Sequence, residues 1–358
     1  PQTPNPCLKK FKNFSKLLRW ERQLNELKML QMRARLPLRN FSLFLEPKHS
    51  WKAPLKVAIC GANGAIGRDQ PVELSLFDLP EFEAKLTGSL MELEDCAFPL
   101  LKGLKKTEDP LQALKEVDYA MLVCPWAWDG QSGLEDLKKS AKFFSKQGRA
   151  LGEVGKAASK VVVVGGAANS GCLALASNCR GLARENFSAL SRLKHNRGLG
   201  LVAKNQVCES GDIEKFCVWG SASSSSFPDT LNVLVSGRQV SFNIDWKNDR
   251  FVPAFQGRDK LILETRGAPY AASLASAAVD HLRDWQLGTD GGWTSMAVLS
   301  DGEYEIEKGL VFSYPVTVEA GRWEVVEGIK LTESSRQKLK VCEKELLEEK
   351  EAIKEFLN

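Results

Sequence analysis

The sequence has little histidine and no long apolar run. Only three histidines occur among 358 residues, and no apolar stretch reaches the roughly 18 residues that a membrane-spanning helix needs, so no transmembrane segment is expected. The nine cysteines are scattered singly without a C-x-x-C pair, which excludes the usual patterns of zinc sites and disulfide frameworks. Their odd number and apolar surroundings predict buried thiols in a reducing compartment.

Charge is distributed unevenly along the chain. The first 50 residues contain eleven Lys or Arg and three Glu, a net +8, whereas the whole chain has +4, so residues 51–358 carry −4. Apolar residues at helical spacing predict an amphipathic helix over 8–33. Such a basic arm is typical of a targeting sequence, a contact to nucleic acid or an anionic membrane, or a docking segment.

Docking onto an acidic protein surface is the favoured interpretation of this arm, and nucleic acid is not expected as a partner. Its aromatic residues are not interleaved for base stacking, and its apolar positions follow the helical period. Its shortage of acidic residues also favours import into a mitochondrion or plastid, with the cytoplasm as the alternative location. The residues expected to make the contact are Lys9, Lys10, Lys12, Lys16 and Arg19.

Apolar strand patterns alternate with helical patterns after residue 54. Strands are predicted over 55–60, 72–77, 119–123 and 161–164, with helical stretches such as 86–93 and 134–144 between them. This alternation predicts a parallel sheet covered by helices on both faces. The second half is more mixed, with strands predicted over 216–220, 231–240, 293–298, 310–318 and 323–326, and helices over 269–282 and 333–357.

The predicted fold class is α/β, a Rossmann-like parallel sheet domain followed by an α+β C-terminal domain. The expected boundaries are 1–53 for the basic extension, 54–173 for the Rossmann-like domain and 174–358 for the C-terminal domain.

A glycine motif follows the first predicted strand directly. Gly61, Gly64 and Gly67 have the spacing that lets a backbone approach a pyrophosphate at a helix N-terminus, and Asp78 closes the second strand, where a carboxylate accepts hydrogen bonds from a ribose diol. Only eleven residues, 61–71, separate the two strands, whereas a parallel crossover needs about a dozen or more, usually with a helix. The motif therefore has two interpretations, a vestigial dinucleotide site and a glycine turn without a ligand.

From residue 55 to the C-terminus, the order and spacing of many segments resemble eukaryotic cytosolic-type malate dehydrogenase of the lactate/malate dehydrogenase family. The first 50 residues have no counterpart in that family. The segments that carry the resemblance are D-Q-P-V-E-L-S-L-F-D (69–78), L-M-E-L-E-D-C-A-F-P-L-L (90–101), V-V-V-G-G-A-A-N-S-G-C-L (162–173), E-N-F-S-A-L-S-R-L-K-H-N-R (185–197), W-G-S-A-S-S-S-S-F-P-D (219–229), D-H-L-R-D-W (280–285), V-L-S-D-G (298–302) and S-Y-P-V (313–316).

The resemblance implies an enzyme that reduces oxaloacetate to malate with NADH, but the family's catalytic residue types are missing. Ala222 occupies the position of the proton-donating His, Lys194 that of the Asp that orients it, and Gly166 that of the Asn beside the nicotinamide. Only Arg197 matches a substrate-binding Arg of the family. The segment that matches the Arg-bearing mobile loop contains Trp126 and Trp128 instead, and no Arg occurs between positions 68 and 149.

None of the histidines is placed to replace the lost proton donor. His49 lies in the linker, His195 matches a non-catalytic family position, and His281 lies in a helical segment where a structural role is expected. The sequence therefore predicts a catalytically inactive protein that serves as a structural or interaction subunit of a larger assembly. Trp126 and Trp128 are interpreted either as interface anchors or as fillers of the vacated pocket.

Two other functions remain open, an NAD-dependent malate dehydrogenase or related oxidoreductase with altered chemistry, and a regulatory protein that binds NAD without turnover. Under the favoured prediction no cofactor or metal is expected, and the partners are protein subunits of a complex or a second copy of this chain.

Overall fold

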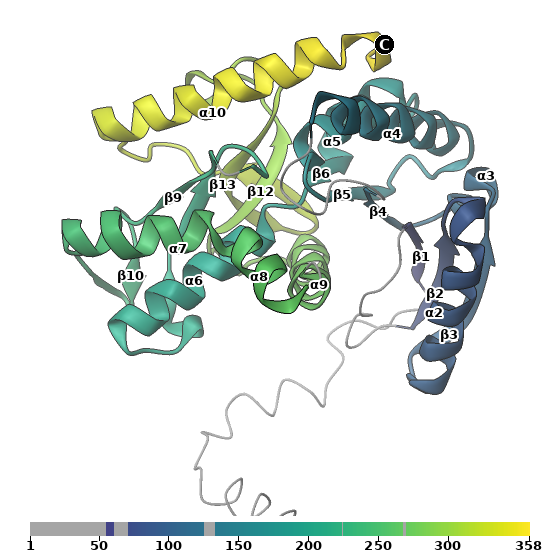
Figure 1. Ribbon diagram of the computed structural model, residues 1–358, viewed down its shortest axis with the longest axis horizontal. Coiled ribbons are helices and arrows are strands. Elements are labelled where there is room, and N and C mark those ends of the chain that lie inside the picture. Colours follow the sequence, from purple (N-terminus) through teal and green to yellow (C-terminus); the bar gives the residue numbers. More distant parts are fainter. Residues whose placement is uncertain (1–54, 61–70, 125–132, 224, 268–269) are drawn as a thin grey trace, which may run out of the picture. The chain divides into compact units, whose positions relative to one another are not determined.

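The chain is represented by a computed structural model, which describes residues 55–60, 71–124, 133–223, 225–267 and 270–358, with only the backbone course of 55–60. Within these residues one sheet of nine strands has the order β14-β13-β12-β6-β5-β4-β1-β2-β3 (Figure 1). Its parallel strands are β1 (Leu55–Cys60), β2 (Val72–Phe77), β3 (Leu101–Thr107), β4 (Tyr119–Val123), β5 (Lys160–Val164) and β6 (Phe187–Ala189). The antiparallel strands are β12 (Thr294–Leu299), β13 (Val311–Glu319) and β14 (Arg322–Val325).

The parallel strands have the order 3-2-1-4-5-6 of a doubly wound fold, which confirms the predicted α/β class. The helices are α2 (Glu83–Asp95), α3 (Pro110–Ala113), α4 (Leu134–Val154), α5 (Ala168–Asn178), α6 (Arg192–Gln206), α7 (Val252–Gln256), α8 (Arg258–Arg266), α9 (Ala271–Leu287) and α10 (Glu333–Ala352). The short strands are β7 (Ile213–Glu214), β8 (Cys217–Trp219), β9 (Phe227–Asp229), β10 (Leu234–Val235) and β11 (Arg238–Gln239).

Helices cover both faces of the sheet, as the unbroken apolar strands predict. Along β4, Ala120 packs in one core cluster with Phe144 of α4, whereas the next residue, Met121, packs in a second cluster with Trp285 of α9. Successive side chains of a strand point to opposite faces, so a strand buried on both faces must be apolar at every position. All five residues of β4 are accordingly buried.

The short link between the first two strands does not prevent parallel pairing. β1 and β2 are hydrogen-bonded neighbours in parallel register, with Leu55 opposite Val72 and Cys60 opposite Phe77. To begin a parallel strand, the link must run back along the six residues of β1, a distance of about 20 Å. The eleven residues 61–71 could span at most about 36–40 Å if they were extended. A link of eleven residues is therefore long enough for β1 and β2 to pair in parallel. Residues 61–70 lie outside the described part.

Two stretches differ from the sequence-based prediction. The strand expected over 231–240 is a tight hairpin, because Ser236 and Gly237 have φ of 50° and 75°, as in a type I′ turn that reverses the chain between β10 and β11. Edge strand β3 was not predicted, since its sequence L-K-G-L-K-K-T is too polar to resemble a buried strand. Lysines are typical of exposed sheet edges, where charge opposes pairing with another chain.

Five of the seven cysteines whose burial is described are buried, as their apolar surroundings predict, whereas Cys96 is exposed and Cys208 is partly buried. Among the described residues no disulfide occurs, and burial raises the pKa of Cys179 and Cys342 to about 11. These thiols therefore behave as small apolar packing groups. The buried cysteines are Cys124, Cys172, Cys179, Cys217 and Cys342.

None of the helices in the described part of the chain is both long and apolar enough to cross a bilayer. That part also contains no group of three or more His, Cys, Asp or Glu side chains able to hold a metal ion.

Several predicted features lie outside the described residues. They are the helix over 8–33, the arm residues Lys9, Lys10, Lys12, Lys16 and Arg19, the glycines Gly61, Gly64 and Gly67, and the loop residues Trp126 and Trp128.

Candidate functional site

Three of the positions singled out from sequence meet around one cavity. Gly166 follows β5, Lys194 lies on α6, and Ala222 lies in the serine-rich loop 221–226 after β8. All three line a cavity of about 30 Å3, together with Asp259 and Tyr270. The structure thus brings together residues separated by up to 104 positions, from Gly166 to Tyr270.

Lys194 holds the serine-rich loop. Its side chain is buried, and the Nζ donates hydrogen bonds to the backbone carbonyl of Ser223 and, at 2.7 Å, to the hydroxyl of Ser226. Burial lowers the pKa of the Lys194 amine to about 7, because a charged amine is poorly solvated there; nearby Asp259 opposes this shift. A lysine at this position is therefore a structural clamp on the loop, with a proton that is lost near neutral pH.

Replacing Lys194 with Met should flatten the rise in stability above neutral pH. An unfolded chain keeps the amine near its ordinary pKa of 10.5, so between about pH 7 and 10.5 the unfolded state binds a proton that the folded state lacks. Wild-type stability therefore rises with pH in this window, by at most about 1.4 kcal/mol per pH unit, and the Lys194→Met variant lacks this contribution.

Urea unfolding at several pH values between 7 and 9 measures this difference. Lys204→Met, at an exposed lysine of the same helix, is the matched control and should keep the wild-type pH dependence. Parallel curves for wild type and Lys194→Met would contradict the assignment.

Arg197 is bonded to groups of the protein itself. The side chain is only 7% exposed, and its Nη1 donates to the carbonyl of Phe255 at 2.8 Å. Its Nη2 forms an ion pair with the carboxylate of Asp259 on α8. An incoming carboxylate would have to displace Asp259 to reach this guanidinium.

Ala222 is held through its backbone. Its N–H donates to Oδ1 of Asn169 at 2.9 Å, and the amide nitrogen of Asn169 donates to the carbonyl of Val311 at 2.8 Å. The asparagine therefore fixes the loop to β13, and the side chain at position 222 contributes a methyl group, which has no exchangeable proton.

The two described histidines do not line this cavity and are poor proton donors. The ring of His195 is hydrogen-bonded through Nδ1 to the hydroxyl of Ser295 at 2.9 Å. Neither ring nitrogen of His281 has a partner within the described part of the chain. Burial lowers the pKa of both imidazoles to about 3, so they are neutral at physiological pH. Tyr270 does line the cavity, but burial raises its pKa to about 12.

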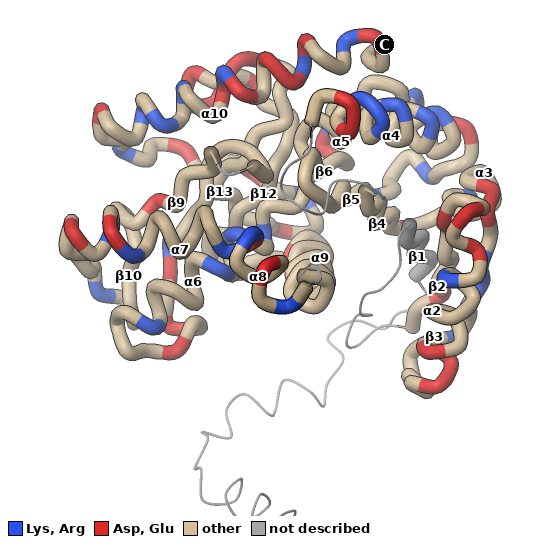
Figure 2. The backbone as a smooth tube through the Cα atoms, in the orientation of Figure 1, with Lys and Arg blue, Asp and Glu red and all other residues tan. Residues whose placement is uncertain are grey.

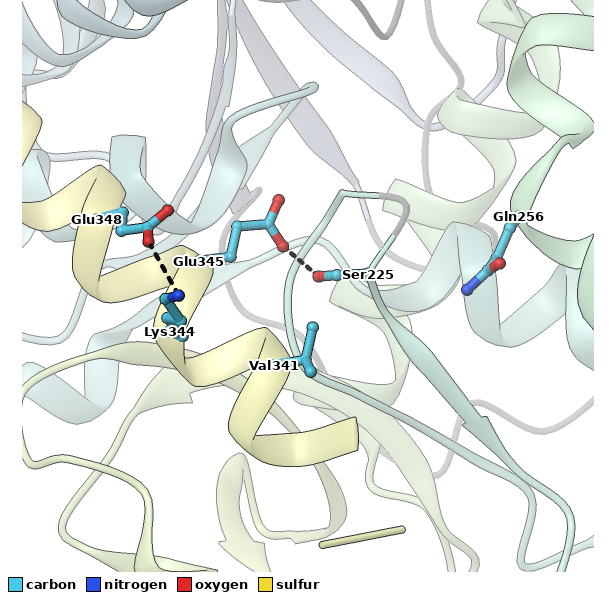
Figure 3. A pocket seen from close by; sticks show the side chains of 6 residues that line it. All are labelled: Ser225, Gln256, Val341, Lys344, Glu345 and Glu348. Atoms are coloured by element: carbon cyan, nitrogen blue, oxygen red, sulfur yellow. Dashed lines mark hydrogen bonds and ion pairs between the residues drawn. The ribbon is translucent and has the colours of Figure 1, made fainter. Parts of the chain in front are cut away.

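Glu345 is a member of the site that the sequence did not reveal. This residue of α10 accepts a hydrogen bond from the hydroxyl of Ser223 at 2.8 Å. It also accepts one from the hydroxyl of Ser225 (Figure 3). An open pocket of about 400 Å3 lies beside them, bordered by Lys344 and Glu348. In the sequence, only the serine-rich stretch 221–226 could have pointed to this contact, because 120 positions separate Ser225 from Glu345.

Asp78 lies where a dinucleotide fold places its ribose-binding carboxylate. It follows β2 directly, and β2 is adjacent to β1. The order of the strands reverses between β1 and β4, which is where this fold binds its ligand. Its Oδ1 accepts a hydrogen bond from the backbone N–H of Leu79 at 2.8 Å, and partial burial raises the pKa of its carboxyl group. Its other oxygen has no partner within the described residues, so this side chain fits a ribose diol.

Part of the chain matches a known family model, and the structure has known relatives. Residues 191–357 match the model of the lactate/malate dehydrogenase, alpha/beta C-terminal domain. The structure is similar to malate dehydrogenase from Naegleria fowleri at 34% identity and a TM-score of 0.80, covering 86% of this chain and 100% of that one. It is also similar to Trichomonas vaginalis lactate dehydrogenase, in complex with NADH and oxamate, at 33% identity and a TM-score of 0.79, covering 84% and 98%.

A more distant structure shares the fold alone. Malate dehydrogenase from Plasmodium falciparum is 13% identical with a TM-score of 0.72, covering 85% of this chain and 100% of that one. Sequence identity above 30% over nearly the full length of the first two relatives, together with the shared fold, shows that this chain belongs to the lactate/malate dehydrogenase family.

Proposed function

We propose that this chain is a catalytically inactive member of the family, of the cytosolic malate dehydrogenase type, that serves as a structural or interaction subunit of a larger assembly. One observation carries the proposal. Among the described residues, no histidine lines the cavity where Gly166, Lys194 and Ala222 meet, and the adjacent Arg197 is paired with Asp259.

The chemistry of 2-keto acid reduction explains why these features matter. Reduction of a ketone requires a group that delivers a proton to its oxygen, and a carboxylate substrate requires a free cation. Ala222 has no proton to give, and Tyr270 is too weak an acid with a pKa of about 12. A cavity of about 30 Å3 holds roughly a water molecule, which is much smaller than a dicarboxylate.

One observation favours a different function, an oxidoreductase with altered chemistry or a regulator that binds NAD without turnover. Lys194 lines the cavity and has a pKa of about 7, which suits a proton donor at neutral pH. Asp78 also remains at the end of β2. If NAD binds, Asp78 would hold its ribose, and the dinucleotide would supply or accept hydride. Against turnover, the hydrogen bonds from Lys194 to Ser223 and Ser226 direct its amine into the loop.

A pair of measurements on the purified full-length chain separates these functions. With NADH and either oxaloacetate or pyruvate, we expect no NADH oxidation above the rate in buffer, while an active malate dehydrogenase serves as the positive control. Energy transfer from tryptophan to bound nicotinamide reports NADH binding independently of turnover. Turnover within about a hundredfold of the active control would refute inactivity. Binding without turnover would favour the regulator.

The assembly is tested separately by the mass of the gently purified native protein. We expect it to elute in a larger complex at fixed stoichiometry, with the basic arm as the proposed tether. Elution as a free monomer would contradict this part of the proposal, and elution as a homodimer would support self-association instead.

A further inference from the structure

Helix α4 exposes a row of cations. Between Asp136 and Glu153 it contains five Lys or Arg and no acidic residue, whereas residues 51–358 as a whole carry −4. Spacings of three and four residues place exposed side chains on one side of the helix. Figure 2 shows this concentration of basic residues along α4. The four exposed cations, called the basic stripe below, are Lys139, Lys142, Lys146 and Arg149.

The centre of the basic stripe is unpaired within the described residues. Lys139 is 3.5 Å from Asp136, one turn earlier, and Nε of Arg149 donates to Oδ1 of Asn178 at 3.2 Å. Among the described residues, no ion pair or hydrogen bond engages the Nζ of Lys142 or of Lys146; the hydroxyl of Ser145 donates only to the backbone carbonyl of Lys142, at 2.9 Å. Two solvent-facing cations one turn apart are therefore available to a partner.

Folding of the helix does not require these charges. The opposite face of α4 packs in the core, where Phe143 is 5% exposed and Phe144 is fully buried. Cations three and four residues apart on a helix repel one another. The basic stripe thus destabilises the helix that carries it, and the carboxylates of a partner would relieve the repulsion.

The surroundings favour an acidic protein over other anions. The aromatic residues of α4 face the core, so none is available to stack on a base or to insert into a bilayer. The basic arm has the same sign of charge as the stripe and is therefore not its occupant.

We propose that the basic stripe of α4 is a docking surface for an acidic segment of a partner protein. This inference rests on the proposed function as an interaction subunit and adds the place and the charge of one contact. Ten residues of helix separate Lys139 from Arg149, which corresponds to about 15 Å, so an acidic helix of about three turns is long enough to face the whole stripe.

Binding of an acidic peptide to the purified full-length chain tests the proposal. The probe is a fluorescein-labelled peptide of glutamates, with a glutamine peptide as the uncharged control, and anisotropy gives the Kd at low and at physiological salt. The double variant Lys142→Glu/Lys146→Glu should weaken binding about tenfold or more. The matched control Lys105→Glu/Lys204→Glu reverses two other exposed lysines and should weaken it less than about twofold.

Zero-length carbodiimide cross-linking then locates the peptide, with bonds from its carboxylates to Lys142 and Lys146 expected. Equal weakening in both double variants would mean that only net charge matters, and would overturn the proposal. Tighter stripe-dependent binding to phosphatidylserine vesicles or to an RNA oligonucleotide than to the peptide would also overturn it. Because the isolated chain is used, this result is independent of whether the native protein elutes in a larger assembly.

Discussion

The substitution Gly198→Ala is expected to lower the free energy of unfolding by about 3 kcal/mol or more. A Cβ atom at this position of α6 would lie 2.0 Å from Cζ and 2.3 Å from Cε1 of Phe216. Phe216 is 1% exposed and packs edge-on against His195, so its rigid ring has nowhere to move. Relieving the clash requires α6 to shift, and overpacking of this kind typically costs about 1–3 kcal/mol and occasionally more.

The same helix offers a matched control. Gly200 is exposed, and a Cβ atom there would meet no atom within 4 Å. Gly200→Ala should therefore stabilise the protein by about 0.5–1 kcal/mol, because alanine favours the helix and restricts the unfolded chain. Unfolding in urea, followed by tryptophan fluorescence, should have its midpoint at a lower urea concentration than wild type for Gly198→Ala and at a higher one for Gly200→Ala. Equal midpoints for the two variants would show that α6 is not pressed against Phe216.

The substitution Asp259→Asn is expected to cost about 2–3 kcal/mol of unfolding free energy. It leaves the guanidinium of Arg197, which is only 7% exposed, without its carboxylate. Breaking a fully buried ion pair costs about 3–5 kcal/mol, and the 27% exposure of Asp259 reduces this figure through solvent screening. Since Asp259 lies on α8 and Arg197 on α6, loosening between these two helices should accompany the loss.

An exposed ion pair gives the comparison for Asp259. Asp301 is 62% exposed and pairs with Arg184 at 2.8 Å, so Asp301→Asn should cost less than about 1 kcal/mol. Adding malonate tests the consequence for ligand binding. If the freed Arg197 accepts an external carboxylate, the Asp259→Asn variant regains stability with malonate concentration and wild type does not. Equal costs for both substitutions would show that the Arg197–Asp259 pair contributes little.

Local sequence determined the sheet and much of its covering. The run of valines over 161–164 is apolar at every position, which suits only a strand buried on both faces, and β5 lies in the middle of the sheet. The hairpin at 234–239 was missed because the positive φ of Ser236 is not encoded by a residue type that prefers it.

The sequence by itself also determined which chemical groups stand at the positions proposed to correspond to the family's catalytic ones. Position 222 carries a methyl group, which has no proton to transfer in any fold. Only the tertiary structure decided what the remaining groups do. Arg197 is retained in the sequence, but its pairing with Asp259, 62 residues away, depends on how α8 packs against α6.

The same physical reason applies to Lys194 and Glu345. The pKa of Lys194 follows from the burial of its amine, and its hydrogen bonds to the serine-rich loop come from a different part of the chain. Glu345 reaches that loop only because α10 crosses it after more than a hundred intervening residues. Periodicity and motifs describe interactions between near neighbours in sequence, whereas burial and contacts between distant segments arise only when the chain is packed.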